Sequence, residues 1–209
     1  MGAFLSMTGI AIGDSQSRNE IAKLLQEFAE GRKGRMFPDG ERNNASTLVI
    51  SGGDGLPVTV LYPWLFLAWE DATRFLSASL GVPAVFLHIH DEDLWMYMLY
   101  SGGELIDQFN PLPDYWREIP AEERAAWKGD AQTFAKHWPG VTQSSIERYL
   151  VPWGFDRPRG VKAYPDDHFE VGDCWQLRDF IRRLGVSYPL DEQGNLLGDR
   201  YFFEVPAKA

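Results

Sequence analysis

The chain has 209 residues and a mass of 23.8 kDa, with 44% hydrophobic and 24% charged residues and a formal net charge of -10 at pH 7. This composition is that of a globular protein, and it excludes a disordered or fibrous chain. No apolar run approaches the length of about 18 residues that a membrane span needs, so no membrane partner is expected. The length suits a single domain over residues 1–209.

Charge is distributed unevenly along the chain. Residues 43–116 contain nine Asp or Glu and only one cation, Arg74. Nucleic-acid binding depends on Lys and Arg contacts to phosphates, so this balance argues against a nucleic-acid partner. The one small basic cluster lies among glycines in residues 31–42 and is interpreted as a solvated loop.

Cysteine usage and the N-terminal residues bear on the compartment. The only cysteine, Cys174, has no second cysteine with which to form an intrachain disulfide, and the first residues lack the pattern of a secretory signal. We therefore expect a cytoplasmic protein.

Strands and helices alternate in the first 80 residues, where turn and capping residues separate the apolar segments. The predicted elements are a strand over 4–12, a helix that starts at a capping box of Ser17 and Glu20 and ends at Gly31, a hairpin of strands 47–51 and 57–62, and a helix over 70–80 ended by Gly81.

The clearest pattern in the chain is a meander of three antiparallel strands over 84–109. The expected strands are 84–90, 94–100 and 104–109, separated by an acidic turn and a Ser-Gly-Gly turn. The middle strand is apolar on both faces, with Trp95, Tyr97 and Leu99 on one and Met96 and Met98 on the other. Such a strand belongs inside a sheet that is covered on both sides.

The composition changes after the meander. Short helices are predicted over 121–127, 130–137 and 144–150, the last opened by a capping box of Ser144 and Glu147; a longer helix follows over 172–184 and a last strand over 201–205. The resulting expectation is an α+β fold with a mainly antiparallel sheet flanked by helices. The sheet-forming portion covers about 1–116, and a helical, loop-rich elaboration covers about 117–209.

A pair of histidines on the first meander strand is the strongest metal-binding pattern. His88 and His90 are two residues apart, so on a strand both imidazoles lie on the same face. Asp91 and Asp93 in the following turn, and the distant His168, are candidate further ligands of a divalent metal. The alternative is that the pair is structural and the carboxylates belong to a solvated turn. If the protein has a functional site, we expect it beside this pair.

Aromatic residues are abundant and several lie close to prolines. Trp64, Trp116 and Trp153 are near prolines, and Tyr115 precedes Trp116. Rings held in such segments make rigid surfaces that grip partners, so these four residues are candidate binding residues. The alternative is that they fill the core.

Three functions remain open. The chain shows no complete catalytic set, which favours a non-catalytic protein-interaction or regulatory module that needs no cofactor. In its general acidic character the chain is similar to the small acidic immunity proteins with which bacteria neutralise toxins, so the expected partner is another protein. The alternatives are a metal-dependent, hydrolytic enzyme built on His88 and His90, and a small-ligand or carbohydrate binder that uses the aromatic loops.

Overall fold

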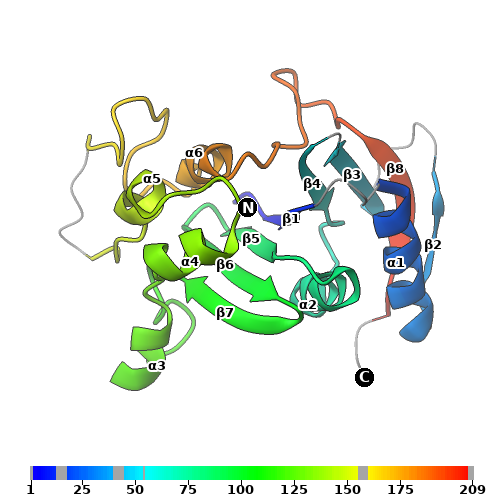
Figure 1. Cartoon of the computed structure of the whole chain (residues 1–209), viewed down its shortest axis with the longest axis horizontal. Helices are drawn as coiled ribbons and strands as arrows, with labels where there is room; N and C mark the ends of the chain where they lie inside the picture. Colours follow the sequence, from blue (N-terminus) through cyan, green and yellow to red (C-terminus); the bar gives the residue numbers. More distant parts are fainter. Residues whose placement is uncertain (1, 13–17, 40–44, 54, 155–159, 207–209) are drawn as a thin grey trace.

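The computed structural model describes residues 2–12, 18–39, 45–53, 55–154 and 160–206. Its strands are β1 (Leu5–Ile10), β2 (Arg35–Pro38), β3 (Thr47–Gly53), β4 (Leu56–Leu61), β5 (Ala84–His90), β6 (Leu94–Ser101), β7 (Glu104–Phe109) and β8 (Asp199–Glu204). They form one eight-stranded sheet in the order β2-β8-β3-β4-β1-β5-β6-β7, and all neighbours pair antiparallel (Figure 1). The predicted α+β fold is therefore confirmed.

The meander of β5, β6 and β7 agrees with the prediction nearly residue for residue. His88 pairs with Met96 and Ile89 with Trp95, so the alternation along β6 sends Trp95 and Met96 to opposite faces. Seven of the eight residues of β6 are buried, as expected for a central strand with cover on both sides.

The elements of the first 80 residues also occur in the predicted order. The helices are α1 (Arg18–Gly31) and α2 (Trp69–Leu80), and the predicted hairpin is formed by β3 and β4. Gly81 ends α2 with a φ of 67°, the left-handed conformation that a residue without Cβ adopts most readily. The predicted cap at Ser17 lies outside the described residues.

The sheet extends beyond the predicted hairpin at the edge farthest from the meander, where β2 and β8 lie. β2 lies within residues 31–42, which the sequence pattern indicated as a loop. β8 agrees with the strand predicted over 201–205, and it inserts between β2 and β3. The sheet is thus not confined to residues 1–116. β2 has only four residues, and three of them are exposed, as is common for an edge strand. Its sequence therefore lacks the apolar alternation from which a strand is predicted.

Helices cover both faces of the sheet. α1 and α2 lie on one face, where their apolar residues join Ile50 and Val60 in a core cluster. The second face carries Tyr97, whose ring is stacked on Phe180 at 5.4 Å between centroids. In Figure 1, α4, α5 and α6 lie in the left half of the view and α1 and α2 in the right half, while the sheet runs across the picture from β7 to β2.

The C-terminal portion is a helical elaboration, as predicted, but two boundaries differ. Its helices are α3 (Ala121–Ala126), α4 (Ala131–His137), α5 (Gln143–Ile146), a 3-10 turn over Glu147–Tyr149, and α6 (Gln176–Arg183). The capping box falls on Thr142 and Ser145 instead of Ser144 and Glu147. The last helix starts at Gln176, four residues after the predicted start at Gly172.

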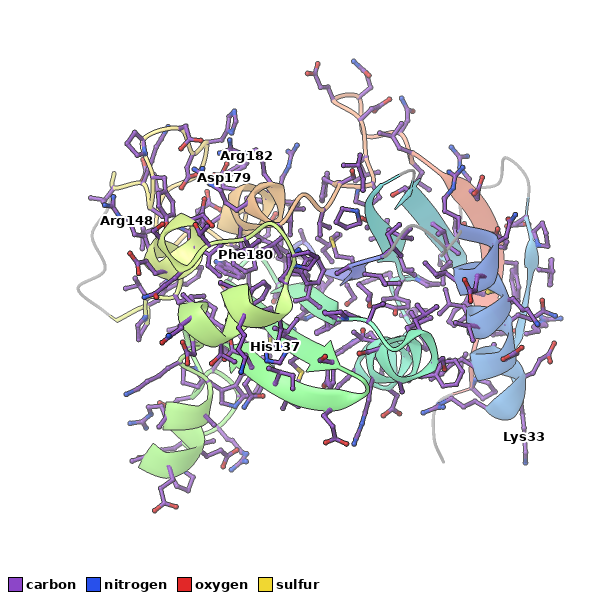
Figure 2. The ribbon with its side chains drawn as sticks, in the orientation of Figure 1. Lys33, His137, Arg148, Asp179, Phe180 and Arg182 are labelled. Atoms are coloured by element: carbon purple, nitrogen blue, oxygen red, sulfur yellow. The ribbon has the colours of Figure 1, made fainter. Side chains whose placement is uncertain are left out.

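Two buried carboxylates fasten the irregular segment before α6 to that helix. Asp179 on α6 accepts hydrogen bonds from the backbone N–H groups of His168 and Phe169, each at 2.8 Å. Asp167 accepts one from the guanidinium of Arg183 on α6 at 3.0 Å, and another from the Tyr149 hydroxyl at 2.6 Å. Figure 2 shows Asp179 near Arg182 on the outer side of α6, while Phe180 lies on the side toward the sheet.

Candidate functional site

A cleft of about 750 Å³ opens at one end of the sheet. It is lined by residues from the start of β1, the end of β4, the end of β5 and the start of β6, which antiparallel pairing brings to the same end. The loop over 62–68 and the first turn of α2 form another wall. The volume lies within the range of about 300–1,000 Å³ that is typical of ligand sites.

Aromatic side chains dominate the cleft. Five of the eight tryptophans of the chain line it: Trp64 and Trp69 from the loop and first turn around the start of α2, and Trp116, Trp127 and Trp175 from three later parts of the chain. Phe4, Phe66, Tyr62 and Tyr188 add further rings. Aromatic side chains commonly line ligand pockets and are enriched at binding surfaces, so this concentration marks the cleft as a candidate binding site.

The floor of the cleft comes from one face of the meander. His88 and His90 on β5 point to the same face as Met96 and Met98 on β6, because His88 pairs with Met96 in the sheet register. Methionine side chains are flexible and polarizable, and they adapt to ligands of different shape. The alternation that the sequence predicts for β6 thus supplies an adaptable apolar floor.

Trp69 is fixed by stacking and by the position of α2. Its ring is parallel to that of Phe86, with centroids 4.0 Å apart and an interplanar angle of 3°. The hydroxyl of Thr73 donates to the Trp69 carbonyl at 2.9 Å and lies 2.5 Å from the hydroxyl of Thr8 on β1. These contacts hold the start of α2 against the sheet and so preorganise the wall of the cleft.

A chain of hydrogen bonds crosses the cleft floor. The Ser6 hydroxyl lies 2.9 Å from Nδ1 of His88, and Nε2 of His88 lies 3.3 Å from Nδ1 of His90. Burial, and secondarily the neighbouring His90, lowers the pKa of His88 to about 4. His88 is therefore neutral at physiological pH.

The mouth of the cleft is built around His90. Phe4, Tyr115 and Trp116 contact its ring edge to face, with centroids between 5.0 and 5.6 Å away. The Tyr115 hydroxyl donates to Asp93 at 2.5 Å, which ties this group to the turn between β5 and β6.

The residues predicted to bind a partner divide into two groups. Trp64 and Trp116 line the cleft and are 57% and 53% exposed, and Tyr115 packs against Trp116. Trp153, in contrast, is only 4% exposed and belongs to the core on the α6 side of the sheet. The aromatic surface predicted from the sequence therefore excludes Trp153.

Of the predicted metal ligands, His88 and His90 lie together, whereas Asp91, Asp93 and His168 bond to other groups. Both ring nitrogens of His88 are engaged, and Asp91 accepts a hydrogen bond from the backbone N–H of Gly2 at 2.8 Å. Asp93 is held by Tyr115, and His168 pairs with Asp179. No group of three His, Cys, Asp or Glu side chains that could hold a metal occurs in the described part of the chain.

Several lining residues carried no recognisable signal in the sequence. Trp127, Trp175 and Tyr188 come from the elaboration and approach the cleft only through the tertiary fold. Trp69 and Glu70 stand at the start of a predicted helix, where a Trp is most simply interpreted as a core residue. The one available signal was the apolar run Leu65–Trp69, which is unusual for a connection between a strand and a helix.

Comparison with protein-family models, with curated proteins and with solved structures finds no match to this chain. None of the helices in the described part combines the length and apolar character that crossing a membrane requires.

Proposed function

We propose that this protein is a non-catalytic binding protein whose aromatic cleft holds a small, largely apolar ligand. The observation that carries the proposal is the gathering of five tryptophans around one open cleft of about 750 Å³. Ligand sites are typically concave, apolar and preformed, with a few polar groups that orient the ligand. Trp69, stacked on Phe86, supplies a rigid wall, and the few polar residues of the lining are Ser6, Glu70, His88 and His90.

The test uses Nile red, an uncharged dye whose emission shifts to shorter wavelength in apolar surroundings. We expect wild-type protein to bind one dye per chain, and Trp116→Ala to weaken binding about fivefold because a ring at the mouth is worth about 1 kcal/mol of contact. Leu105→Ala is the matched control, since Leu105 is 45% exposed but lies on β7 and does not line the cleft. Equal binding by wild type and Trp116→Ala, or no binding at all, would contradict the proposal.

A second candidate, a protein-interaction module, is favoured by the loop beside the cleft. Leu65 and Leu67 are 71% and 78% exposed and flank the buried Phe66, and Trp64 adjoins them. Single exposed leucines are ordinary, but a contiguous apolar group of this kind is typical of surfaces that partner proteins cover. An immunity-like role belongs to this candidate.

A photo-crosslinker placed at position 65 tests the second candidate. We expect it to capture one discrete partner, and the same protein carrying Leu67→Ser to lose that product. Products that are diffuse, or that persist in the Leu67→Ser version, would contradict an interaction through this loop.

A further inference from the structure

The cleft is biased toward positive ligands by the charges around it. Glu70 lines the cleft, and none of the described lining residues is a lysine or arginine. Most of the lining residues belong to residues 43–116, a stretch that contains nine Asp or Glu residues and one cation, Arg74. Arg74 does not line the cleft, and its guanidinium donates to the carbonyl of Gly103. An anionic ligand would meet like charge here without a compensating cation.

The polar groups of the floor are too few and too occupied for a sugar. Ser6, His88 and His90 already bond to one another, and His88 stays neutral because burial lowers its pKa to about 4. A carbohydrate brings many hydroxyl groups, and each one buried without a partner weakens binding. The floor therefore favours a ligand whose body is apolar.

The carboxylate of Glu70 is held in place at the cleft wall. Its Oε1 accepts a hydrogen bond from the hydroxyl of Tyr100 at 3.0 Å, and Tyr100 is itself 2% exposed. Trp69 and Glu70 both line the cleft at the start of α2, so an indole ring and a carboxylate are offered to the same cavity. Aromatic faces attract cations placed within about 6 Å of the ring, tryptophan most strongly, and a carboxylate adds to that attraction.

We infer that the ligand of this cleft is an organic cation, whose ammonium group lies between Glu70 and the tryptophan rings and whose apolar chain covers Met96 and Met98. This inference rests on the proposed ligand-binding function and adds the chemical class of the ligand. It requires only contacts that the cleft already offers: aromatic faces, one carboxylate and an apolar floor.

The test compares three probes that share a hexyl chain but differ in charge. Hexyltrimethylammonium, hexan-1-ol and hexanesulfonate are titrated into the protein, with tryptophan fluorescence and calorimetry as readouts. We expect the cation to bind at least about tenfold more tightly than the alcohol, and the sulfonate to bind most weakly. Cation binding is expected to weaken at high salt, as screening reduces the contribution of Glu70.

Two variants assign the charge effect to the cleft. Glu70→Gln, which keeps an acceptor for Tyr100, is expected to lower affinity for the cation about tenfold and to leave the alcohol unchanged. Glu104→Gln is the matched control, because Glu104 is exposed on β7 and does not line the cleft. Cation and alcohol binding equally, or Glu70→Gln having no effect, would overturn the inference but leave the binding function intact. If no probe binds and Nile red also fails, the binding function itself is overturned.

Discussion

The imidazoles of His88 and His90 are joined nitrogen to nitrogen: Nε2 of His88 lies 3.3 Å from Nδ1 of His90. One nitrogen must donate and the other accept, so the two rings cannot both be protonated without loss of this bond. With Ser6 at the other nitrogen of His88, the pair forms a closed polar group on the cleft floor. The two histidines, whose spacing is that of metal ligands, thus hydrogen-bond to each other in this structure.

The first prediction concerns the pH dependence of stability. The pKa of His88 is about 4 in the folded chain and about 6.5 when unfolded, so the unfolded state binds more protons between these values. The contribution of neutral His88 to the free energy of unfolding is complete above pH 6.5 and is lost as pH falls through 4. This contribution is on the order of 3 kcal/mol. Urea unfolding should therefore show that wild type loses about 3 kcal/mol relative to His88→Gln as pH falls from 7 to 4. A constant difference would contradict the prediction.

The meander could be predicted from the sequence because its signals are local. Turn residues separate β5, β6 and β7, and the alternation of Trp95 and Met96 fixes the faces of the central strand. α2 and its end at Gly81 were predictable for the same reason. β2 was not, because a strand of four residues at a sheet edge depends on the partner strand β8, which follows about 160 residues later.

The cleft could be predicted only in part. His88, His90, Trp64 and Trp116 were candidates, but the sequence offered no reason for them to share one cavity. That cavity depends on tertiary contacts that carry no sequence pattern. His168, the distant candidate ligand, pairs instead with the buried carboxylate of Asp179, a contact that no sequence pattern indicates.

The second prediction contrasts two adjacent carboxylates that both bind Arg183. The side chain of Asp167 is fully buried and also accepts from Tyr149, whereas the side chain of Asp166 is 55% exposed. Removing one partner of a buried charge network leaves the others unpaired, so Asp167→Asn should lower the free energy of unfolding by about 3 kcal/mol. Asp166→Asn should cost less than about 1 kcal/mol, as exposed ion pairs do. Equal losses in urea unfolding would show that burial does not determine how much each carboxylate contributes to the free energy of unfolding.

The third prediction concerns the turn between β5 and β6. Asp91 and Glu92 have φ values of 49° and 62°, and the N–H of Asp93 donates to the carbonyl of His90 at 2.9 Å. This is a β-turn whose two central residues are both left-handed, the type that favours glycine at the second of them. Glu92→Gly should therefore raise the free energy of unfolding by about 0.5–1 kcal/mol. Gly81→Ala is the reverse control: its added Cβ meets nothing within 4 Å, yet its φ of 67° should make the variant less stable by about 1 kcal/mol. Thermal and urea unfolding measure both, and a less stable Glu92→Gly would count against the argument.

The fourth prediction concerns the close approach of β1 and the segment after α6. A Cβ on Gly9 would lie 2.9 Å from Cγ2 of Val186 and 3.3 Å from Cγ1 of Val85, closer than side chains normally pack. Val186 is 4% exposed and cannot move away without disturbing the core, so Gly9→Ala should destabilise the protein by about 1–3 kcal/mol. Val186→Ala should itself cost about 1–3 kcal/mol, because it leaves a cavity.

Because Val186→Ala removes the methyl groups that the new Cβ would strike, the double variant should be more stable than the sum of the single losses. We expect a coupling of at least about 1 kcal/mol, measured by urea unfolding of the wild type, both single variants and the double variant. Losses that add to within about 0.5 kcal/mol would mean that Gly9 is required for a reason other than the approach of Val186. The same cycle with Val85→Ala is the control, since its contact is longer and its coupling should be correspondingly smaller.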